Sequence, residues 1–221
     1  AARAFLDDIP RRVDEYERLL NDNLIWRERT QGIAPLARED AIALGATGPV
    51  LRGSGVAHDI RKLLPYGGYE EFVFDVPTEP AGDAYARYRV RMEEMRQSRG
   101  IAQQALEGLP DGPVITADPK VALPPRSDLA RSMEAVIHQF KLVSEGVHPP
   151  VGDSYVATES ARGEKGYFVV SDGSNRPARV HVRAPSFYNL QTLPVMVENR
   201  PLADTVVAIA SIDIILGDVD R

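Results

Sequence analysis

The longest regular pattern in the sequence is DAYARYRVRMEEMRQSRGIAQQALEG, residues 83–108. Asp83 is a suitable N-cap and Gly108 a suitable C-terminal stop, whereas Gly100 weakens a helix locally. Between them, apolar side chains recur every three or four residues, which places them on one face of an α-helix; they are Tyr85, Tyr88, Met92, Met95, Ala102 and Leu106. The stretch therefore predicts one long helix whose apolar face must pack against another element.

Two further helices are predicted on either side of this one. Near the N-terminus, apolar residues again recur at helical spacing; they are Phe5, Ile9, Val13, Tyr16 and Leu20. Pro10 is expected in the first turn, where its missing N–H costs nothing. Another helix is predicted from Asp128 to about Glu145, with Ser127 as its cap and Gly146 as its end. The Pro-rich stretch 109–125 is expected to be a surface loop rather than a domain boundary, because both flanking helices have apolar faces to bury.

The pattern changes period in the last third of the chain. Strands are predicted at Ser154–Thr158, Gly166–Val170 and Arg179–Arg183, with a hairpin turn over residues 171–177. A short strand at Phe72–Val76 and short helices at 38–44, 187–193 and 202–211 complete the prediction. The fold class is therefore mainly α with a small antiparallel β-hairpin or sheet (α+β). A helical core is expected over about 1–146, and the hairpin and C-terminal segment over 147–221.

The composition excludes several classes of protein. The 221 residues contain no cysteine, and 26 basic against 32 acidic residues give a formal charge of −6. Without thiolates the chain cannot hold a disulfide, a thiolate zinc site or its own iron–sulfur cluster, and the acidic balance argues against nucleic-acid binding. The longest apolar stretch, 206–216, contains Asp213 and is too short to span a bilayer. The sequence starts within a helical pattern and has neither an initiator methionine nor signal-peptide features, so we expect a fragment of a longer chain.

No complete catalytic or metal-binding motif is present. The glycine-rich stretch 45–55 lacks the Gly-Lys-Ser/Thr of a phosphate-binding loop, and His58 stands where a dinucleotide fingerprint needs its third glycine, so a structural loop is favoured. The four histidines lack metal-ligand spacing, and the arginines between 87 and 99 are expected on a solvated face with salt bridges. Arg162-Gly163-Glu164 is expected to be a turn. By themselves, these residues indicate a soluble, mostly helical domain without a self-contained active site.

Several long segments resemble one family. They are residues 14–20, 23–26, 29–33, 47–57, 59–62, 88–98, 107–113, 171–177, 183–187, 189–191 and 217–221. Over essentially the whole chain, these segments resemble the 49-kilodalton subunit (the D subunit) of the proton-pumping NADH–quinone oxidoreductase, respiratory complex I. His58 stands where the family commonly has tryptophan in Gly-Val-Ala-Trp-Asp. The family subunit is longer, and the resemblance is to its C-terminal part, so no histidine here is given the role of the family's quinone-headgroup residues.

The same family is similar to the large subunit of nickel–iron hydrogenases, which implies that subunit's fold with a helical-bundle core. There, cysteine pairs hold the metal in a pattern like Asp-Pro-Cys-x-x-Cys. Aligned on Asp213, this sequence has Ile215 and Asp218 at the cysteine positions, so no nickel–iron site is expected. A hydrogenase loop resembling Pro-Arg-Gly matches at Arg162-Gly163. In the quinone-reducing family, the space that corresponds to the metal cavity of the hydrogenases lies near the quinone headgroup.

The resemblance implies a set of site residues. Arg162, Gly163, Asp218, Val219 and Arg221 are candidates for the quinone cavity, with Arg162 and Arg221 able to stabilise negative charge on a quinone as it is reduced. A loop near the site is expected to contain Arg52, Gly53, Ser54 and Gly55. No metal ligand is assigned.

The resemblance also implies partners and a location. No cofactor is expected on this chain; quinone is the substrate, and the iron–sulfur cluster that reduces it belongs to a partner. The implied partners are the other complex I subunits designated B, C, I and H, of which the last is the quinone-side membrane subunit. The complex is expected to be peripheral, on the cytoplasmic face of the bacterial inner membrane, and to couple electron transport to proton translocation. The fragment alone is expected to be inactive. The alternative is a purely structural scaffold segment, which is favoured if segments 162–164 and 217–221 lie far apart.

Overall fold

The computed structural model describes residues 2–220, which form two compact units. The described part of the first unit consists of residues 2–108, 157–166 and 182–220, and the second of residues 109–156 and 167–181. The second unit begins at Leu109, so the expectation that 109–125 is no boundary is wrong. Its helix keeps its apolar face largely exposed, with Met133 76% and Phe140 66% accessible. The expectation depended on burial of that face, and within residues 2–220 the face is not buried.

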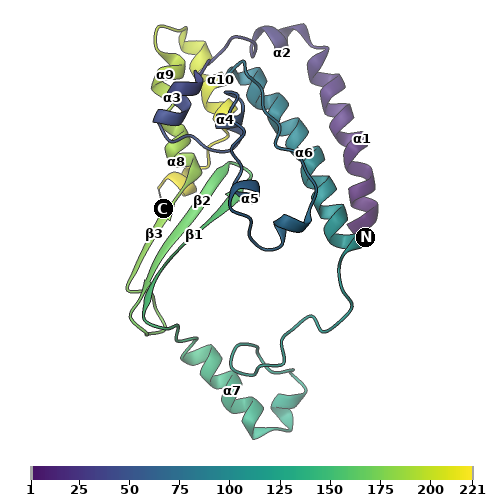
Figure 1. Ribbon diagram of the computed structural model, residues 1–221, viewed down its shortest axis with the longest axis vertical. Helices are drawn as coiled ribbons and strands as arrows, with labels where there is room; N and C mark the ends of the chain where they lie inside the picture. The colour runs from purple at the N-terminus through teal and green to yellow at the C-terminus, as the bar shows by residue number, and fades with distance from the viewer. Residues whose placement is uncertain (1, 221) are drawn as a thin grey trace. The chain divides into compact units, whose positions relative to one another are not determined.

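The helices and strands confirm a mainly α protein with a small antiparallel sheet (Figure 1). The helices of the first unit are α1 (Ala2–Asn21), α2 (Leu24–Glu28), α3 (Arg38–Ala43), α4 (Pro49–Arg52), α5 (Ile60–Leu63), α6 (Ala84–Glu107), α8 (Pro185–Leu190), α9 (Leu193–Val197), α10 (Leu202–Ile212) and α11 (Leu216–Val219), with a 3-10 turn at Tyr69–Glu71. The second unit contains a 3-10 turn, Asp128–Ala130, and α7 (Met133–Ser144). Strands β1 (Gly152–Ser160), β2 (Gly163–Ser171) and β3 (Arg179–Arg183) pair in the order β1-β2-β3 and run through both units.

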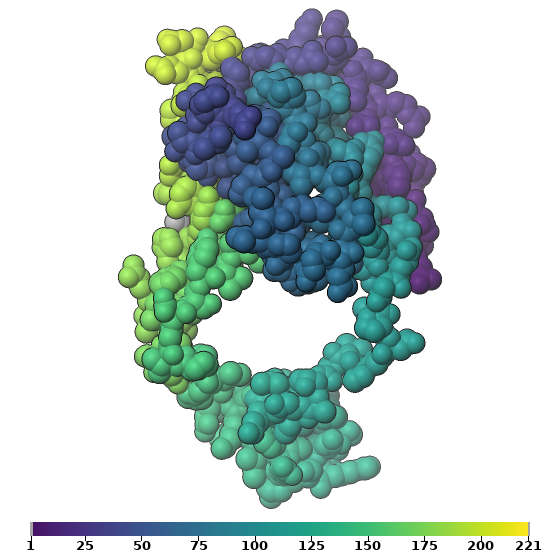
Figure 2. Space-filling model, viewed as in Figure 1, coloured from purple at the N-terminus to yellow at the C-terminus, as the bar shows by residue number. Residues whose placement is uncertain are grey.

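The long predicted helix is confirmed as α6, and its ends are those expected from the sequence. Asp83 accepts a hydrogen bond from the Ala86 N–H at 2.7 Å and another from the Gly32 N–H at 2.8 Å, and Gly108 is the C-cap. Helix α1 packs along α6 (Figures 1 and 2). Arg96 joins the two helices, with N–O distances of 2.6 Å to Glu17 and 3.0 Å to Asp14.

Helix α1 starts earlier than expected, so Pro10 lies inside it rather than in its first turn. A proline in a helix interior cannot donate to the carbonyl four residues earlier, which here belongs to Leu6. The Arg99 side chain of α6 donates to that carbonyl instead, at 3.1 Å. Contact with α6 therefore supplies the donor that the proline lacks.

Two other predicted elements differ from the structure. Residues 72–76 form no strand; the backbone N–H and C=O of Val73 both bond to the Gln104 amide of α6, which takes the place of a neighbouring strand. The helix predicted from Asp128 is interrupted, and Ser132 rather than Ser127 caps α7, accepting from the Ala135 N–H. Ser127 instead donates to the Asp128 carboxylate, at 3.1 Å.

The hydrophobic core of the first unit lies between the 34–51 segment and helices α9 and α10. Its buried members are Ala34, Leu36, Ala41, Ala46, Val50, Leu51, Met196, Ala208 and Ile212. Within residues 2–220, no helix is both long and apolar enough to cross a membrane.

The arginines of α6 are not all on a solvated face, contrary to the sequence prediction. Arg87 is fully buried and donates to the Gly82 and Ala34 carbonyls, each at 2.8 Å, and to the Ser211 hydroxyl at 3.0 Å. Burial, together with the nearby Arg91 charge, lowers the pKa of Arg87 to about 9. The three acceptors come from separate segments of the chain, so Arg87 ties these segments to α6.

Candidate functional site

The candidate residues Arg162 and Gly163 lie at the turn between β1 and β2, as the sequence predicted. Strand β1 ends at Ser160 and β2 begins at Gly163. The Ser160 hydroxyl donates to the Gly163 carbonyl at 2.8 Å and accepts from the Arg162 N–H at 3.3 Å. On the far side of the turn, the Glu164 N–H donates to the Thr47 hydroxyl at 3.1 Å. The turn is thus closed on itself and attached to the glycine-rich stretch.

Two glycines allow this attachment. A Cβ atom on Gly48 would lie 2.5 Å from the Gly163 Cα, and one on Gly163 would lie 2.5 Å from the Thr47 hydroxyl oxygen. Both distances are far below normal contact, and both glycines have positive φ, +67° and +132°. The two backbone segments cross so closely that only glycine fits at either position.

Asn189 of α8 connects the same two segments through its side chain. It is 1% exposed; its amide oxygen accepts from the Thr47 N–H at 3.0 Å, and its amide nitrogen donates to the Arg162 carbonyl at 3.1 Å. Both polar ends of this buried amide are therefore satisfied by the turn and the loop beneath it.

The turn also contacts the C-terminal segment, which the resemblance had assigned to the same cavity. The Arg162 guanidinium donates to the Asp213 carbonyl at 2.8 Å and lies 3.2 Å from its carboxylate. Asp213 caps α10 in the left-handed conformation, with φ +57°, which points its carbonyl out of the helix. Lys165 of β2 lies 3.2 Å from the Asp218 carboxylate of α11. The segments around 162–165 and 213–218 are therefore neighbours.

The Asp218 carboxylate also accepts from the Ser186 N–H of α8, at 3.3 Å. Partial burial acts to raise the pKa of Asp218, but this hydrogen bond and Lys165 outweigh it and lower the pKa below its usual value. Val219 follows in α11 and is half-buried. Arg221, the remaining cavity candidate, lies outside the described residues.

The expected loop at 52–55 is only partly irregular, because Pro49–Arg52 forms a helical turn, α4. Ser54 is buried and donates to the Leu36 carbonyl at 2.9 Å. A Cβ on Gly53 would lie 2.8 Å from the Arg87 side chain, and Gly55 has φ +81°. Ser54 and Gly53 therefore allow the end of α4 to pack closely against Leu36 and Arg87.

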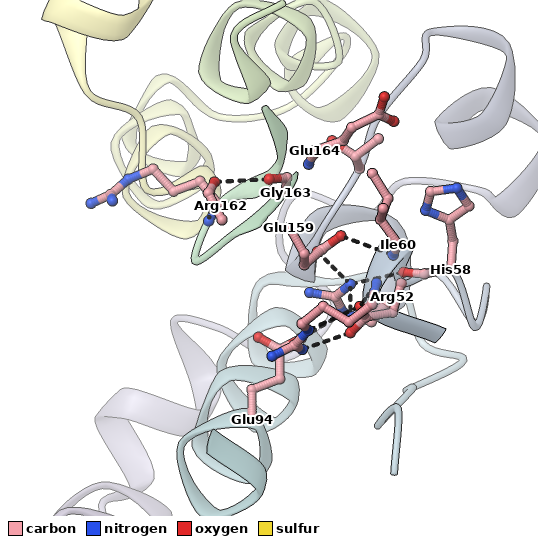
Figure 3. A network of polar contacts seen from close by, with 12 residues as sticks. Arg52, His58, Ile60, Glu94, Glu159, Arg162, Gly163 and Glu164 are labelled. Carbon is pink, nitrogen blue, oxygen red and sulfur yellow. Dashed lines mark hydrogen bonds and ion pairs between the residues drawn. The ribbon is translucent and has the colours of Figure 1, made fainter. Parts of the chain in front are cut away.

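Arg52 is 2% exposed and lies in a cluster of buried charges (Figure 3). Its guanidinium contacts Glu94 of α6, donates to the Glu159 carboxylate of β1 at 2.9 Å, and donates to the His58 carbonyl at 2.8 Å. Figure 3 shows the His58 ring turned away from this cluster, so the network uses only the backbone of that residue.

The electrostatics of the cluster follow from burial. Burial alone would lower the pKa of Arg52, but Glu94 and Glu159 raise it overall. Burial raises the pKa of Glu94 despite the Arg52 charge beside it. The pKa of Asp59 is lowered because Arg61, in contact at 2.6 Å, overcomes its desolvation.

Exposed apolar side chains flank the polar contacts of the turn and the C-terminal segment. On α8 and around α11, Phe187 is 38%, Ile215 47% and Leu216 66% exposed. The site thus combines cationic donors, each next to a carboxylate, with apolar surface. Among residues 2–220, no group of three or more histidine, aspartate or glutamate side chains is placed to hold a metal ion.

Sequence reasoning missed four residues that build this site: Thr47, Glu159, Lys165 and Asn189. Each forms its contact with a residue far away in the chain, so no local pattern could reveal it. The only available signal was that Thr47 and Asn189 fall within the segments that resemble the family.

Comparison with known proteins agrees with the resemblance. The whole chain, residues 1–221, matches the family model of the respiratory-chain NADH dehydrogenase 49-kilodalton subunit. Similar curated proteins include a D subunit (number 2) of NADH-quinone oxidoreductase from Roseiflexus sp. (strain RS-1), 56% identical over 100% of this chain and 54% of that protein. The corresponding D subunit of Protochlamydia amoebophila is 55% identical over 99% of this chain and 54% of its own length.

A more distant relative, the D subunit of the enzyme from Wolbachia sp. subsp. Brugia malayi, is 47% identical over 98% of this chain and 56% of that protein. The chain spans about half the length of these curated relatives. With a family model that covers every residue, the chain belongs to the 49-kilodalton subunit family of the respiratory-chain NADH dehydrogenase.

Proposed function

We propose that this chain is part of a proton-translocating NADH–quinone oxidoreductase and helps to form its quinone-reduction site. The observation that carries the proposal is the meeting of two segments far apart in sequence. Arg162 lies against Asp213, and Lys165 against Asp218, at 3.2 Å in each pair. A purely structural scaffold, the alternative, would not require cationic side chains and exposed apolar residues at one place.

The chemistry of quinone reduction fits these groups. Reduction places negative charge on the quinone oxygens, and cationic side chains such as those of Arg162 and Lys165 stabilise such charge. The exposed apolar side chains of Ile215 and Leu216 suit the apolar body of a quinone. We propose an iron–sulfur cluster of a partner subunit as the electron donor; the 221 residues of the sequence contain no cysteine to ligate one.

The proposal includes partners and a location. We propose that the subunits designated B, C and I, together with the quinone-side membrane partner designated H, surround the full-length protein, and that the assembly lies on the cytoplasmic face of the bacterial inner membrane. Relatives are named as D subunits of NADH-quinone oxidoreductase, which supports a place in such a complex. Coupling to proton translocation is proposed for the complex as a whole.

The test uses Val219→Phe and Asp218→Asn in the full-length subunit within the intact complex. Two rates are measured: NADH oxidation with quinone, and NADH oxidation with a water-soluble acceptor that takes electrons before the quinone site. We expect both variants to raise the quinone KM and change inhibitor sensitivity while the second rate stays unchanged. Val114→Phe, at a side chain 99% exposed in the second unit, is the matched control. Unchanged quinone kinetics and inhibition in both site variants would contradict the proposal.

A further inference from the structure

A buried ion cluster lies next to the β1–β2 turn, because one of its members, Glu159, directly precedes Ser160. Its centre is Arg52, whose side chain is 2% exposed, and Glu159, whose side chain is 3% exposed. On the basis of the proposed function, we infer that Arg52 is a positioning residue. Through Glu159, it fixes the turn that presents Arg162 and Gly163 to the quinone.

Glu159 is held at three points. One carboxylate oxygen accepts from Arg52 at 2.9 Å, and the other accepts from the Ile60 N–H at 3.3 Å. The backbone N–H of Glu159 donates to the Tyr66 hydroxyl at 2.9 Å. Both the side chain and the backbone of this residue are therefore fixed to the segment that follows Arg52.

Glu159 is directly followed by the turn. Ser160, the next residue, donates to the Gly163 carbonyl at 2.8 Å and accepts from the Arg162 N–H. A displacement of Glu159 must therefore move Ser160 and the backbone of the turn. In Figure 3 the Arg162 side chain points away from Arg52 and Glu159, so the connection runs through the backbone and not through contact of the two guanidinium groups.

Helix α4 does not need the Arg52 side chain to hold its own end. The Glu79 N–H donates to the Arg52 carbonyl at 3.0 Å, and the Gly82 N–H donates to the Gly53 carbonyl at 2.9 Å. Backbone bonds already anchor this end of the helix. A buried ion pair also adds little net stability, because desolvation offsets its attraction. What the Arg52 side chain adds is a link from α4 and α6 to β1.

The charge geometry makes arginine necessary for this role. The guanidinium is a single planar group that donates to Glu94, to the His58 carbonyl and to Glu159. Lysine is a single point charge on a flexible stem and cannot reach all three acceptors in fixed directions. Arg52→Lys should therefore keep the charge but loosen the turn.

The experiment compares Glu159→Leu with Glu94→Leu in the full-length subunit within the intact complex. Each removes one carboxylate partner of Arg52, but only Glu159 leads into the turn. Hydrogen exchange of the Arg162 and Glu164 amides is measured together with the quinone KM and kcat. We expect Glu159→Leu and Arg52→Lys to speed exchange at these amides by roughly tenfold or more and to raise the quinone KM. Glu94→Leu should change both quantities less than Glu159→Leu does, and the exposed control Arg89→Gln should change neither.

Unchanged exchange at the turn in Glu159→Leu, or an equal change in Glu94→Leu, would overturn the inference. So would faster exchange without a change in quinone KM, provided that Arg162→Ala does raise that KM. The variant Arg162→Ala tests the proposed function separately, because it removes a cavity residue and leaves the Arg52 cluster intact. If Arg162→Ala itself leaves quinone kinetics unchanged, the proposed function is refuted, and the quinone role of Arg52 is refuted with it.

Discussion

Replacing Gly48 with alanine is expected to destabilise the first unit and displace the β1–β2 turn. Gly48 has φ +67° and ψ −148°, a region nearly exclusive to glycine that costs other residues about 1–3 kcal/mol. The added Cβ would lie 2.5 Å from the Gly163 Cα and 2.6 Å from the Arg162 carbonyl oxygen, so the backbone must move. That movement breaks the bonds from Glu164 to Thr47 and from Thr47 to Asn189, worth about 0.5–1.5 kcal/mol each. The expected loss is roughly 2–6 kcal/mol.

The assay is urea unfolding of the chain followed by circular dichroism, which gives the free energy of unfolding. Gly32→Ala is the matched control, because Gly32 has nearly the same φ, +68°, but open space around its Cβ position. It reports the cost of a side chain at positive φ, about 1–3 kcal/mol, without a collision with the turn. If Gly48→Ala costs no more than Gly32→Ala, the close crossing does not hold the turn and the reasoning is wrong.

Other predictions concern α1, α6 and the C-terminal segment. Arg99→Ala should lower the free energy of unfolding by about 1 kcal/mol. The loss should be smaller when Pro10→Ala is also present, because the new Ala N–H can then donate to the Leu6 carbonyl. Additive losses in a double-mutant cycle would contradict this. Gly100→Ala should raise the free energy of unfolding by about 0.5–1 kcal/mol, since its Cβ would meet nothing within 4 Å in α6; a loss would refute it. Asp218 has a pKa lowered below 3.8, so its stabilisation is present above that pH and is lost as pH falls through the lower folded value. Asp218→Asn should therefore show a shallower loss of stability on acidification, measured by unfolding at stepped pH, and an unchanged slope would count against the Lys165 contact.

The sequence predicted those elements whose determinants are local. Asp83 and Gly108 end α6 because a side-chain cap and a glycine act within one helical turn. The failures involved distant partners. Pro10 lies inside α1 because Arg99 supplies a donor, and residues 72–76 form no strand because Gln104 takes the backbone groups that a strand would pair. Neither contact can be predicted from neighbouring residues in the sequence.

The candidate site divides in the same way. Arg162 and Gly163 are candidates through the family resemblance, and the turn that holds them is a local feature predicted from the sequence. The cluster around Arg52 was missed as a cluster, because its members come from α4, α6 and β1, up to 107 positions apart in the chain. The burial of Arg87 was also missed, since two of its acceptors are the backbone carbonyls of Ala34 and Gly82, which carry no signal in the sequence, and the third, Ser211, is distant in the chain.

The central claim is that residues around 162–165 and 213–219 line a quinone site. Photo-crosslinking a quinone analogue in the intact complex, followed by mass-spectrometric mapping of labelled peptides, tests it most directly. The account predicts label on peptides that contain 160–165 or 213–220, reduced by an excess of unmodified quinone. The claim would be contradicted if the label that excess quinone reduces were found only on other peptides, with none on these two segments.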